Sequence, residues 1–194
     1  MSIKEKNLAS VPAVFLDRDG VINNDIGYFT DPKKLVIPSE TINGLLKLNN
    51  AGFILIIVTN QSGIARGLIE EKGVKSLHNI LHAILREYNI TITGIIYCPH
   101  HPTEGNGVYT QKCECRKPSP GMIIEAGKKF NIDLTNSYII GDRFSDIKAG
   151  INADLKSTIL IKSKHKISEE EKKCASIFCA DVDKAADWIL DLNN

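Results

Sequence analysis

Residues 11–20, VPAVFLDRDG, decide the fold. The run 11–16 is short, apolar and rich in β-forming residues, and it stops abruptly at Asp17-Arg18-Asp19-Gly20. A run of this kind is typical of a buried strand that leads into a polar loop. We therefore expect Asp17 and Asp19 just beyond the carboxyl end of a strand, where Gly20 permits a tight turn.

Outward from this stretch, short apolar runs alternate with helical patterns. Strands are expected at 53–58, 95–97, 137–140 and 158–161, and helices from Ser39 as capping residue to Gly52, then at 70–88, 120–130, 145–150 and 182–190. This alternation predicts an α/β fold, a Rossmann-like and mostly parallel sheet with helices on both faces. Because ligands bind beyond the carboxyl ends of such strands, we expect Asp17, Thr59 and Asp142 to converge there.

Length and composition exclude several classes of protein. The 194 residues suit one domain covering 1–194. Lys and Arg total 24 against 23 Asp and Glu, and this net charge of +1 argues against a nucleic-acid or membrane-surface protein. No apolar run approaches the ~20 residues that span a bilayer, and residues 1–10 lack the apolar stretch of a signal peptide. We therefore expect a cytoplasmic protein.

The carboxylates at the strand ends suit a hard cation. Asp17 and Asp19 from one strand, with Asp142 from another, would suit Mg²⁺, which prefers oxygen ligands and keeps positions open for water and phosphate. The alternative is that Asp-Arg-Asp-Gly is only a turn, since Asp and Gly favour turns. The string lacks the ligand spacing of a calcium-binding EF-hand.

The five cysteines fall into two groups, and in a reducing compartment they are thiols or metal ligands rather than disulfides. The pairs Cys98-x-His100 and Cys113-x-Cys115 form a Cys₃His set for structural Zn²⁺, on a loop at about 98–115. Ordinary loop thiols are the alternative, and the neighbouring His101 is a second candidate for the fourth ligand. Cys174 and Cys179 lack partner spacing and are interpreted as packing residues.

The motifs then resemble a known superfamily. The sequence DRDG at 17–20, the sequence TNQ at 59–61, Lys117, and the pair Gly141-Asp142 with Asp146 are similar to the four ordered motifs of the haloacid dehalogenase superfamily. More narrowly, FLDRDGVIN, GYF, TNQSGIARG, CPHHP, CECRKPSPGM and IIGDRFSDI resemble the bacterial D-glycero-D-manno-heptose 1,7-bisphosphate phosphatases. The narrower resemblance extends over most of the chain and thins out after about Ile161.

The resemblance implies a role for each catalytic residue. Asp17 is the expected nucleophile, which forms an aspartyl-phosphate, and Asp19 the expected general acid and base. Mg²⁺ is expected on the Asp17 carboxylate, the Asp19 backbone carbonyl and Asp142. Thr59 and Lys117 are expected to bind phosphoryl oxygens. Asp146 is expected to support the metal or Lys117.

Other residues are candidates for substrate binding because they lie close to these motifs. They are Asn23, Asp25, Tyr28, Asn60, Gln61, Ser62, Arg116 and Arg143, with Arg66 equally a solvated loop charge. Arg143 stands where similar enzymes often have Lys, and Arg18 faces either solvent or the substrate. No separate cap domain fits between the motifs, so we expect an open site with a minimal cap, compatible with a monomer.

The resemblance implies a phosphatase that removes the C7 phosphate of a heptose 1,7-bisphosphate, with the heptose 1-phosphate feeding nucleotide-heptose synthesis. Histidinol-phosphate phosphatase is the runner-up, because those enzymes resemble the chain in all four motifs and the zinc loop. The strings GIARG and GYF favour the heptose enzyme. A zinc-stapled, non-catalytic binding module is a remote alternative. His78 and His82, four residues apart, lack the Glu of a zincin motif, which argues against a metal site there.

Overall fold

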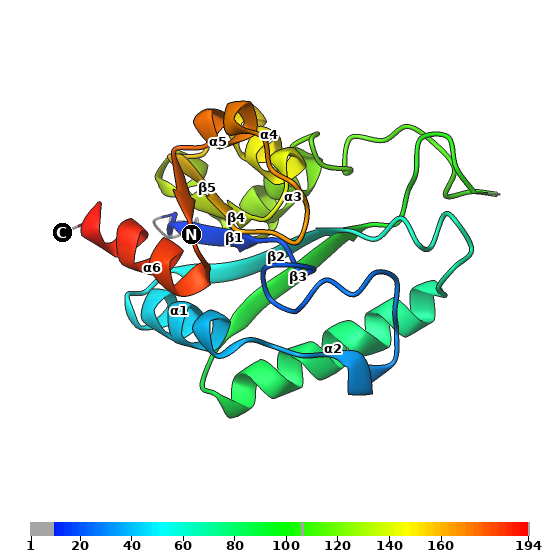
Figure 1. Cartoon of the computed structure of the whole chain (residues 1–194), viewed down its shortest axis with the longest axis horizontal. Coiled ribbons are helices and arrows are strands. Elements are labelled where there is room, and N and C mark those ends of the chain that lie inside the picture. The colour runs from blue at the N-terminus through cyan, green and yellow to red at the C-terminus, as the bar shows by residue number, and fades with distance from the viewer. Residues whose placement is uncertain (1–9, 106, 194) are drawn as a thin grey trace, which may run out of the picture.

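A six-stranded sheet forms the centre of the protein, whose computed structural model describes residues 10–105 and 107–193. The strands lie in the order β3-β2-β1-β4-β5-β6, and every pair is parallel (Figure 1). They are β1 Ala13–Leu16, β2 Ile54–Asn60, β3 Ile92–Cys98, β4 Tyr138–Gly141, β5 Ser157–Ile161 and β6 Ile177–Cys179. The predicted Rossmann-like parallel sheet is confirmed.

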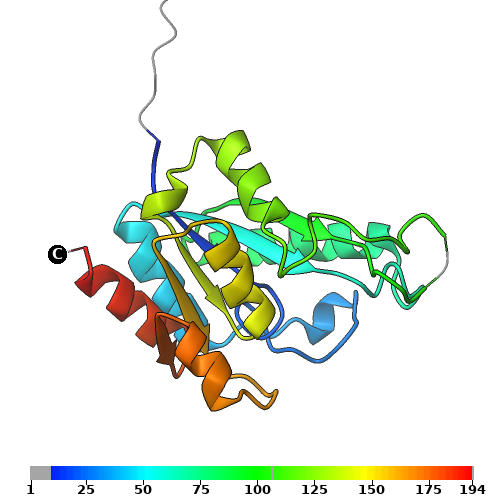
Figure 2. The same cartoon turned by 90° about the horizontal axis from the view of Figure 1, so that it is seen from above.

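Helices cover both faces of this sheet. On one face lie α1 (Ser39–Asn50), α2 (Glu71–Glu87) and α6 (Val182–Asp191). On the other face lie α3 (Gly121–Phe130) and α4 (Phe144–Asn152), which are in front of the sheet in the view from above (Figure 2). The short α5 (Glu169–Cys174) leads into β6, and single 3₁₀ turns occupy Pro32–Lys34 and Leu134–Asn136. Among the described residues, no helix is long and apolar enough to cross a bilayer.

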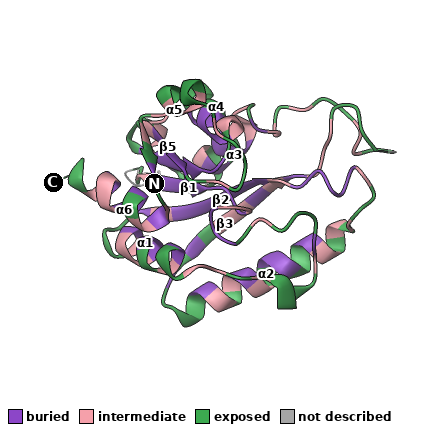
Figure 3. Cartoon of the chain, viewed as in Figure 1, coloured by how far each residue is buried: buried purple, intermediate pink, exposed green. Residues whose placement is uncertain are grey.

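The central strand explains why 11–16 decides the fold. All four residues of β1 are fully buried (Figure 3). Val14 and Leu16 point into the core beneath α1, α2 and α6, whereas Ala13 and Phe15 point into the core beneath α3 and α4. Because neighbouring side chains of a strand point to opposite faces, a strand covered on both faces must be apolar at every position.

Five details differ from the sequence predictions. Ser39 does not cap α1: Pro38 holds the cap position, and the Ser39 hydroxyl donates to Glu40. β2 continues through Asn60 instead of ending at Val58, and β3 begins at Ile92. The sequence analysis missed β6, a strand of three residues. Cys179 is buried in the core as predicted, but Cys174 is exposed, so its interpretation as a packing residue is wrong.

Candidate active site

Three neighbouring strands deliver the predicted catalytic groups to one edge of the sheet. Asp17 follows β1, Asp142 follows β4, and Thr59 is the second-to-last residue of β2. Gly20 allows the loop after β1 to approach Asp142: its φ is +89°, and a Cβ there would lie 2.3 Å from Asp142 Oδ2. A side chain at position 20 would therefore displace the carboxylate.

We expect Gly20→Ala to destabilise the protein more than Gly52→Ala. Gly52 has φ +88° and open space around its Cβ position, so this control carries only the left-handed strain of about 1–2 kcal/mol. Gly20→Ala adds overpacking of about 1–3 kcal/mol. Urea unfolding of both variants measures the difference. Equal losses of stability in the two variants would show that the Asp142 carboxylate moves away from a Cβ at position 20 with no loss of stability.

Lys117 contacts two buried carboxylates at this edge of the sheet. Its Nζ lies 2.9 Å from Asp17 Oδ1 and 2.6 Å from Asp146 Oδ1, and it also donates to the Val58 carbonyl at 2.7 Å. Asn60 fixes the backbone of Lys117, since its side-chain amide accepts from Lys117 N and donates to Lys117 O. Burial alone would lower the pKa of Lys117, but Asp146 and Asp17 outweigh it and raise this pKa.

Asp17, Asp142 and Asp146 form a buried carboxylate cluster, with one oxygen of each within 4.8 Å of the others. Burial, together with the charges of Asp146, Asp142 and Asp19, raises the pKa of Asp17 to about 7 against the opposing effect of Lys117. Ser163 Oγ donates to Asp142 Oδ2 at 2.7 Å, while the buried Oδ1 of Asp142 has no hydrogen-bond partner. Three carboxylates share one lysine here, and an Asp142 oxygen has no hydrogen-bond partner. Carboxylate oxygens with excess negative charge are the ligands that a hard divalent cation prefers.

The Asp19 carboxylate is outside this cluster. Arg18 Nη2 contacts both of its carboxylate oxygens, at 2.9 and 2.7 Å, and Arg18 Nε contacts Oδ1 at 3.1 Å. Gln61 Nε2 and Asn23 Nδ2 donate to the same carboxylate. Arg18 is 1% exposed, and it does not line the pocket described below. It therefore faces neither solvent nor the substrate pocket, the two possibilities that the sequence left open.

A pocket of about 450 Å³ opens above these groups. Its walls include the predicted residues Asp17, Asp19, Asp25, Tyr28, Thr59, Asn60, Gln61, Ser62, Arg66, Arg116, Lys117 and Arg143, together with Asp146. Of the predicted substrate-binding residues, Asn23 does not line it; this side chain is buried against Asp19.

Two residues at the rim of the pocket, Lys164 and His165, were not predicted from the sequence. They follow β5 and fold back onto Asp25, whose carboxylate lies 3.0 Å from Lys164 Nζ, 3.1 Å from His165 Nε2 and 3.0 Å from Arg143 Nη2. Desolvation opposes these contacts, but the hydrogen bonds from Gly27 N, His165 and Lys164 hold the pKa of Asp25 well below its usual range. The signal available in the sequence was a basic run, 162–166, just after an expected strand.

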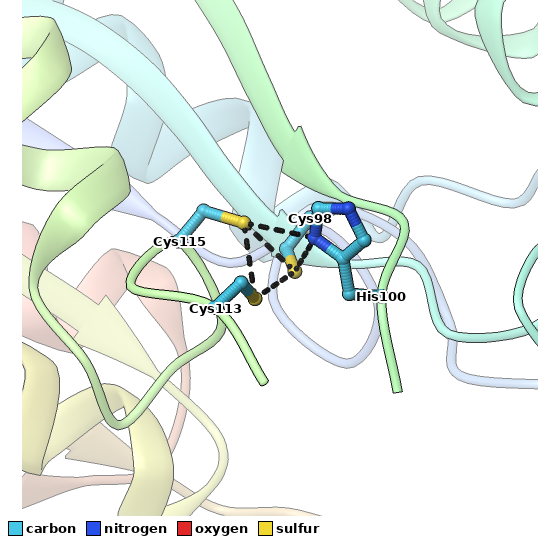
Figure 4. A group of neighbouring side chains, drawn as sticks. All are labelled: Cys98, His100, Cys113 and Cys115. Atoms are coloured by element: carbon cyan, nitrogen blue, oxygen red, sulfur yellow. Dashed lines mark hydrogen bonds between the residues drawn. The ribbon is translucent and has the colours of Figure 1, made fainter. Parts of the chain in front are cut away.

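The four predicted ligands of the second metal site meet at the end of β3 (Figure 4). The Sγ of Cys98 lies 3.6 Å from Cys113 Sγ and 3.1 Å from Cys115 Sγ, and His100 Nδ1 lies 3.3 Å from Cys115 Sγ. Thiolates around one tetrahedral zinc would lie about 3.8 Å apart, so small movements complete the site. His101 is outside the group and contacts Arg66 and the backbone of Glu104.

The loop that carries these ligands has a second anchor on α2. Glu71 accepts hydrogen bonds from the hydroxyls of Tyr97 and Tyr109, at 2.6 and 2.5 Å. Arg66, between β2 and α2, pairs with Glu104 of the same loop, and in both views the two segments extend together beyond the sheet (Figures 1 and 2). Arg66 is therefore engaged by protein groups even though it lines the pocket.

Comparisons with known proteins agree on one family. The family model described as HAD-hydrolase-like matches residues 114–185. The D-glycero-beta-D-manno-heptose-1,7-bisphosphate 7-phosphatase of Pasteurella multocida is 43% identical over 84% of this chain and 89% of its own length. The enzyme of that name from Escherichia coli K12 is 37% identical over 94% and 90%. A crystal structure of D,D-heptose 1,7-bisphosphate phosphatase from B. bronchiseptica, complexed with magnesium and phosphate, is 26% identical with a TM-score of 0.77, covering 94% of this chain and 99% of that one.

Proposed function

Because the chain belongs to the D-glycero-beta-D-manno-heptose-1,7-bisphosphate 7-phosphatases, a family of HAD-like hydrolases, we propose that it hydrolyses the C7 phosphate of that bisphosphate. The product is heptose 1-phosphate, which feeds nucleotide-heptose synthesis. The observation that carries the proposal is Asp17, a carboxylate at the end of the central strand with Lys117 Nζ at 2.9 Å, below a pocket rimmed by cations.

In the proposed reaction, an Asp17 oxygen attacks the C7 phosphorus and the bond from phosphorus to the sugar oxygen breaks. Asp19 gives its proton to that leaving oxygen. Water then attacks the aspartyl-phosphate, gives a proton to Asp19 and releases phosphate, which restores Asp17. Lys117 and the Thr59 hydroxyl bind phosphoryl oxygens and offset the charge that develops on them.

Metal ions complete the proposed site. The carboxylates of Asp17 and Asp142, with the backbone carbonyl of Asp19, are the proposed Mg²⁺ ligands, and Asp146 supports Lys117 at 2.6 Å. When bound, the ion offsets the repulsion between the anionic nucleophile and the phosphate. Cys98, His100, Cys113 and Cys115 are the proposed ligands of structural Zn²⁺.

Basic side chains of the pocket are suited to the second phosphate of the bisphosphate. Arg116, Arg143 and Lys164 line the pocket, and one carboxylate, Asp25, partners the last two. This leaves excess positive charge at the mouth. Such a surplus favours a substrate with phosphates at both ends, whereas histidinol phosphate has a cationic amine at the other end.

We further propose one domain over 1–194 that acts as a monomer in the cytoplasm. The single sheet and the free thiols of all five cysteines support this proposal.

The proposed function predicts a preference for the bisphosphate over histidinol phosphate, with Mg²⁺ present. Lys164→Ala should raise KM for the bisphosphate about tenfold, by roughly the contribution of a charge-assisted hydrogen bond, and leave kcat nearly unchanged. Lys166→Ala, which removes an exposed cation two residues away that does not line the pocket, is the control.

Phosphate release on both substrates measures these values. A preference for histidinol phosphate would assign the runner-up function instead. An unchanged KM in Lys164→Ala would show that Lys164 does not bind the substrate.

A further inference from the structure

His78 is a buried histidine behind the active site. It lies in the middle of α2 and is 6% exposed. Its Nε2 is 3.0 Å from Arg18 Nη1, and its ring packs edge-on against Tyr97 with centroids 5.5 Å apart. The contact joins two segments 60 residues apart in the sequence, and one of them is the motif that carries Asp17 and Asp19.

The contact with Arg18 determines which nitrogen of the His78 ring carries the proton. A guanidinium has only donors, so Nε2 of His78 must accept, and the ring carries its proton on Nδ1. Burial, followed by the positive charge of Arg18, lowers the pKa of His78 to about 3, against the opposing charge of Asp19. His78 is therefore a neutral acceptor at any pH near neutrality.

The two sides of the Arg18 guanidinium have different partners. Nη1 contacts His78, whereas Nη2 and Nε contact Asp19, and Nη2 also contacts Gln61 Oε1 at 3.3 Å. The ring of Phe29 lies 5.7 Å from the guanidinium carbon. Because the group is planar and rigid, a partner at Nη1 sets the direction in which the other nitrogens point.

His82, four residues further along α2, does not contact Arg18. His82 Nε2 contacts the carbonyl of Ile92 at 3.2 Å, and the groups of metal-ligating side chains among the described residues do not include either histidine. The spacing of four residues thus places two histidines in one groove with Lys75 and Tyr97, but only His78 touches the catalytic motif.

We propose that His78 is a positioning residue that fixes Arg18 and, through it, the direction of the Asp19 carboxylate. The inference rests on the proposed role of Asp19 as general acid. Without an acceptor at Nη1, the guanidinium turns toward its remaining acceptors, Asp19 and Gln61, and carries the Asp19 carboxylate with it. Asp19 then delivers its proton poorly to a leaving oxygen.

The test compares two leaving groups. A sugar alcohol leaves only if it is protonated, whereas the p-nitrophenol of p-nitrophenyl phosphate is acidic enough to leave as the anion. The variants are His78→Leu, which removes the acceptor, and His78→Gln, whose amide oxygen replaces Nε2. His82→Leu, one turn further along α2 in the same groove, is the matched control.

We expect His78→Leu to lower kcat/KM for the heptose bisphosphate about 10- to 100-fold, part of the ~10²–10⁴ that general acid catalysis contributes. The value for p-nitrophenyl phosphate should change less than about threefold, and His78→Gln should restore most of the loss. His82→Leu should leave the ratio of the two values unchanged. kcat/KM reports the first phosphoryl transfer, in which Asp19 acts as the acid.

Equal losses on both substrates, or the same selective loss in His82→Leu, would overturn the inference. If His78→Leu does not fold, Arg18→Lys provides the test, since it keeps the charge but cannot contact His78 and Asp19 together; an unchanged ratio there would also overturn it. Failure of the wild-type protein to hydrolyse either substrate would instead overturn the proposed function.

Discussion

Asp17→Asn abolishes phosphate release, with kcat reduced roughly 10⁴-fold or more, as when other enzymes lose their nucleophile. The amide has nearly the shape of the carboxylate but does not attack phosphorus. The substitution also removes one of the two carboxylates that contact Lys117 Nζ. The other is Asp146, at 2.6 Å. Phosphate release and acid-stable labelling from a ³²P-labelled substrate measure the loss of turnover and of the aspartyl-phosphate.

The same substitution should leave the fold intact and stabilise it when metal is removed. Burial raises the pKa of Asp17 to about 7, so the folded protein must bear an unfavourable buried charge above that pH, whereas the unfolded chain ionises Asp17 freely near its usual pKa of 3.8. With EDTA present, the gain in Tm should therefore grow between about pH 4 and pH 7 and level off above pH 7.

Asp191→Asn, at the exposed end of α6, is the control for both measurements. Turnover by Asp17→Asn within tenfold of the wild-type rate would assign the nucleophile to another residue. A gain in Tm that does not depend on pH would contradict the interpretation that the buried charge of Asp17 destabilises the folded protein.

Cys113→Ser with Cys115→Ser is the second large effect. Two of the four proposed ligands are lost, and the apparent free energy of structural zinc binding, about 10–16 kcal/mol in small zinc domains, no longer holds the loop. Cys115 is followed at once by Arg116 and Lys117, so the displaced loop misplaces both cations. We expect kcat/KM to fall at least about 100-fold, the cost of displaced positioning groups, and the purified protein to contain no zinc.

Cys174→Ser is the matched control, because this thiol is exposed and lies outside the cluster; it should keep its zinc and its activity. Elemental analysis and circular dichroism accompany the assays, since the rest of the sheet should remain folded. A folded double variant without zinc but with full activity would show that catalysis does not depend on zinc binding by this loop.

The meeting of the candidate catalytic residues at one edge of the sheet was predictable because it follows from topology. Once residues 11–16 are a central parallel strand, the residues after it and after its two neighbours must meet, and Asp17, Thr59 and Asp142 do so. The Cys/His group was predictable for a different reason, the paired spacing of ligands, and the structure gathers all four side chains.

What sequence could not reveal depends on contacts between distant loops. Lys164 and His165 reach the pocket because Asp25, about 140 residues earlier, holds them there, and no local pattern encodes that contact. Arg18 lies between two aspartates in a polar loop, yet it is buried because His78 supplies an acceptor from α2. The strand β6 was missed because only three residues form it and one of them, Phe178, is exposed.

The position of β1 has a consequence for synthesis on the ribosome. Its neighbours on the two sides are β2 and β4, and the hydrogen bond from Ala13 N to Ser137 Oγ joins residues 124 positions apart. At about 5–20 residues per second, the nascent chain spends on the order of ten seconds with this wholly apolar strand open along one side. Chaperone binding should concentrate in that interval, and chains arrested before β4 should aggregate rather than accumulate as stable fragments.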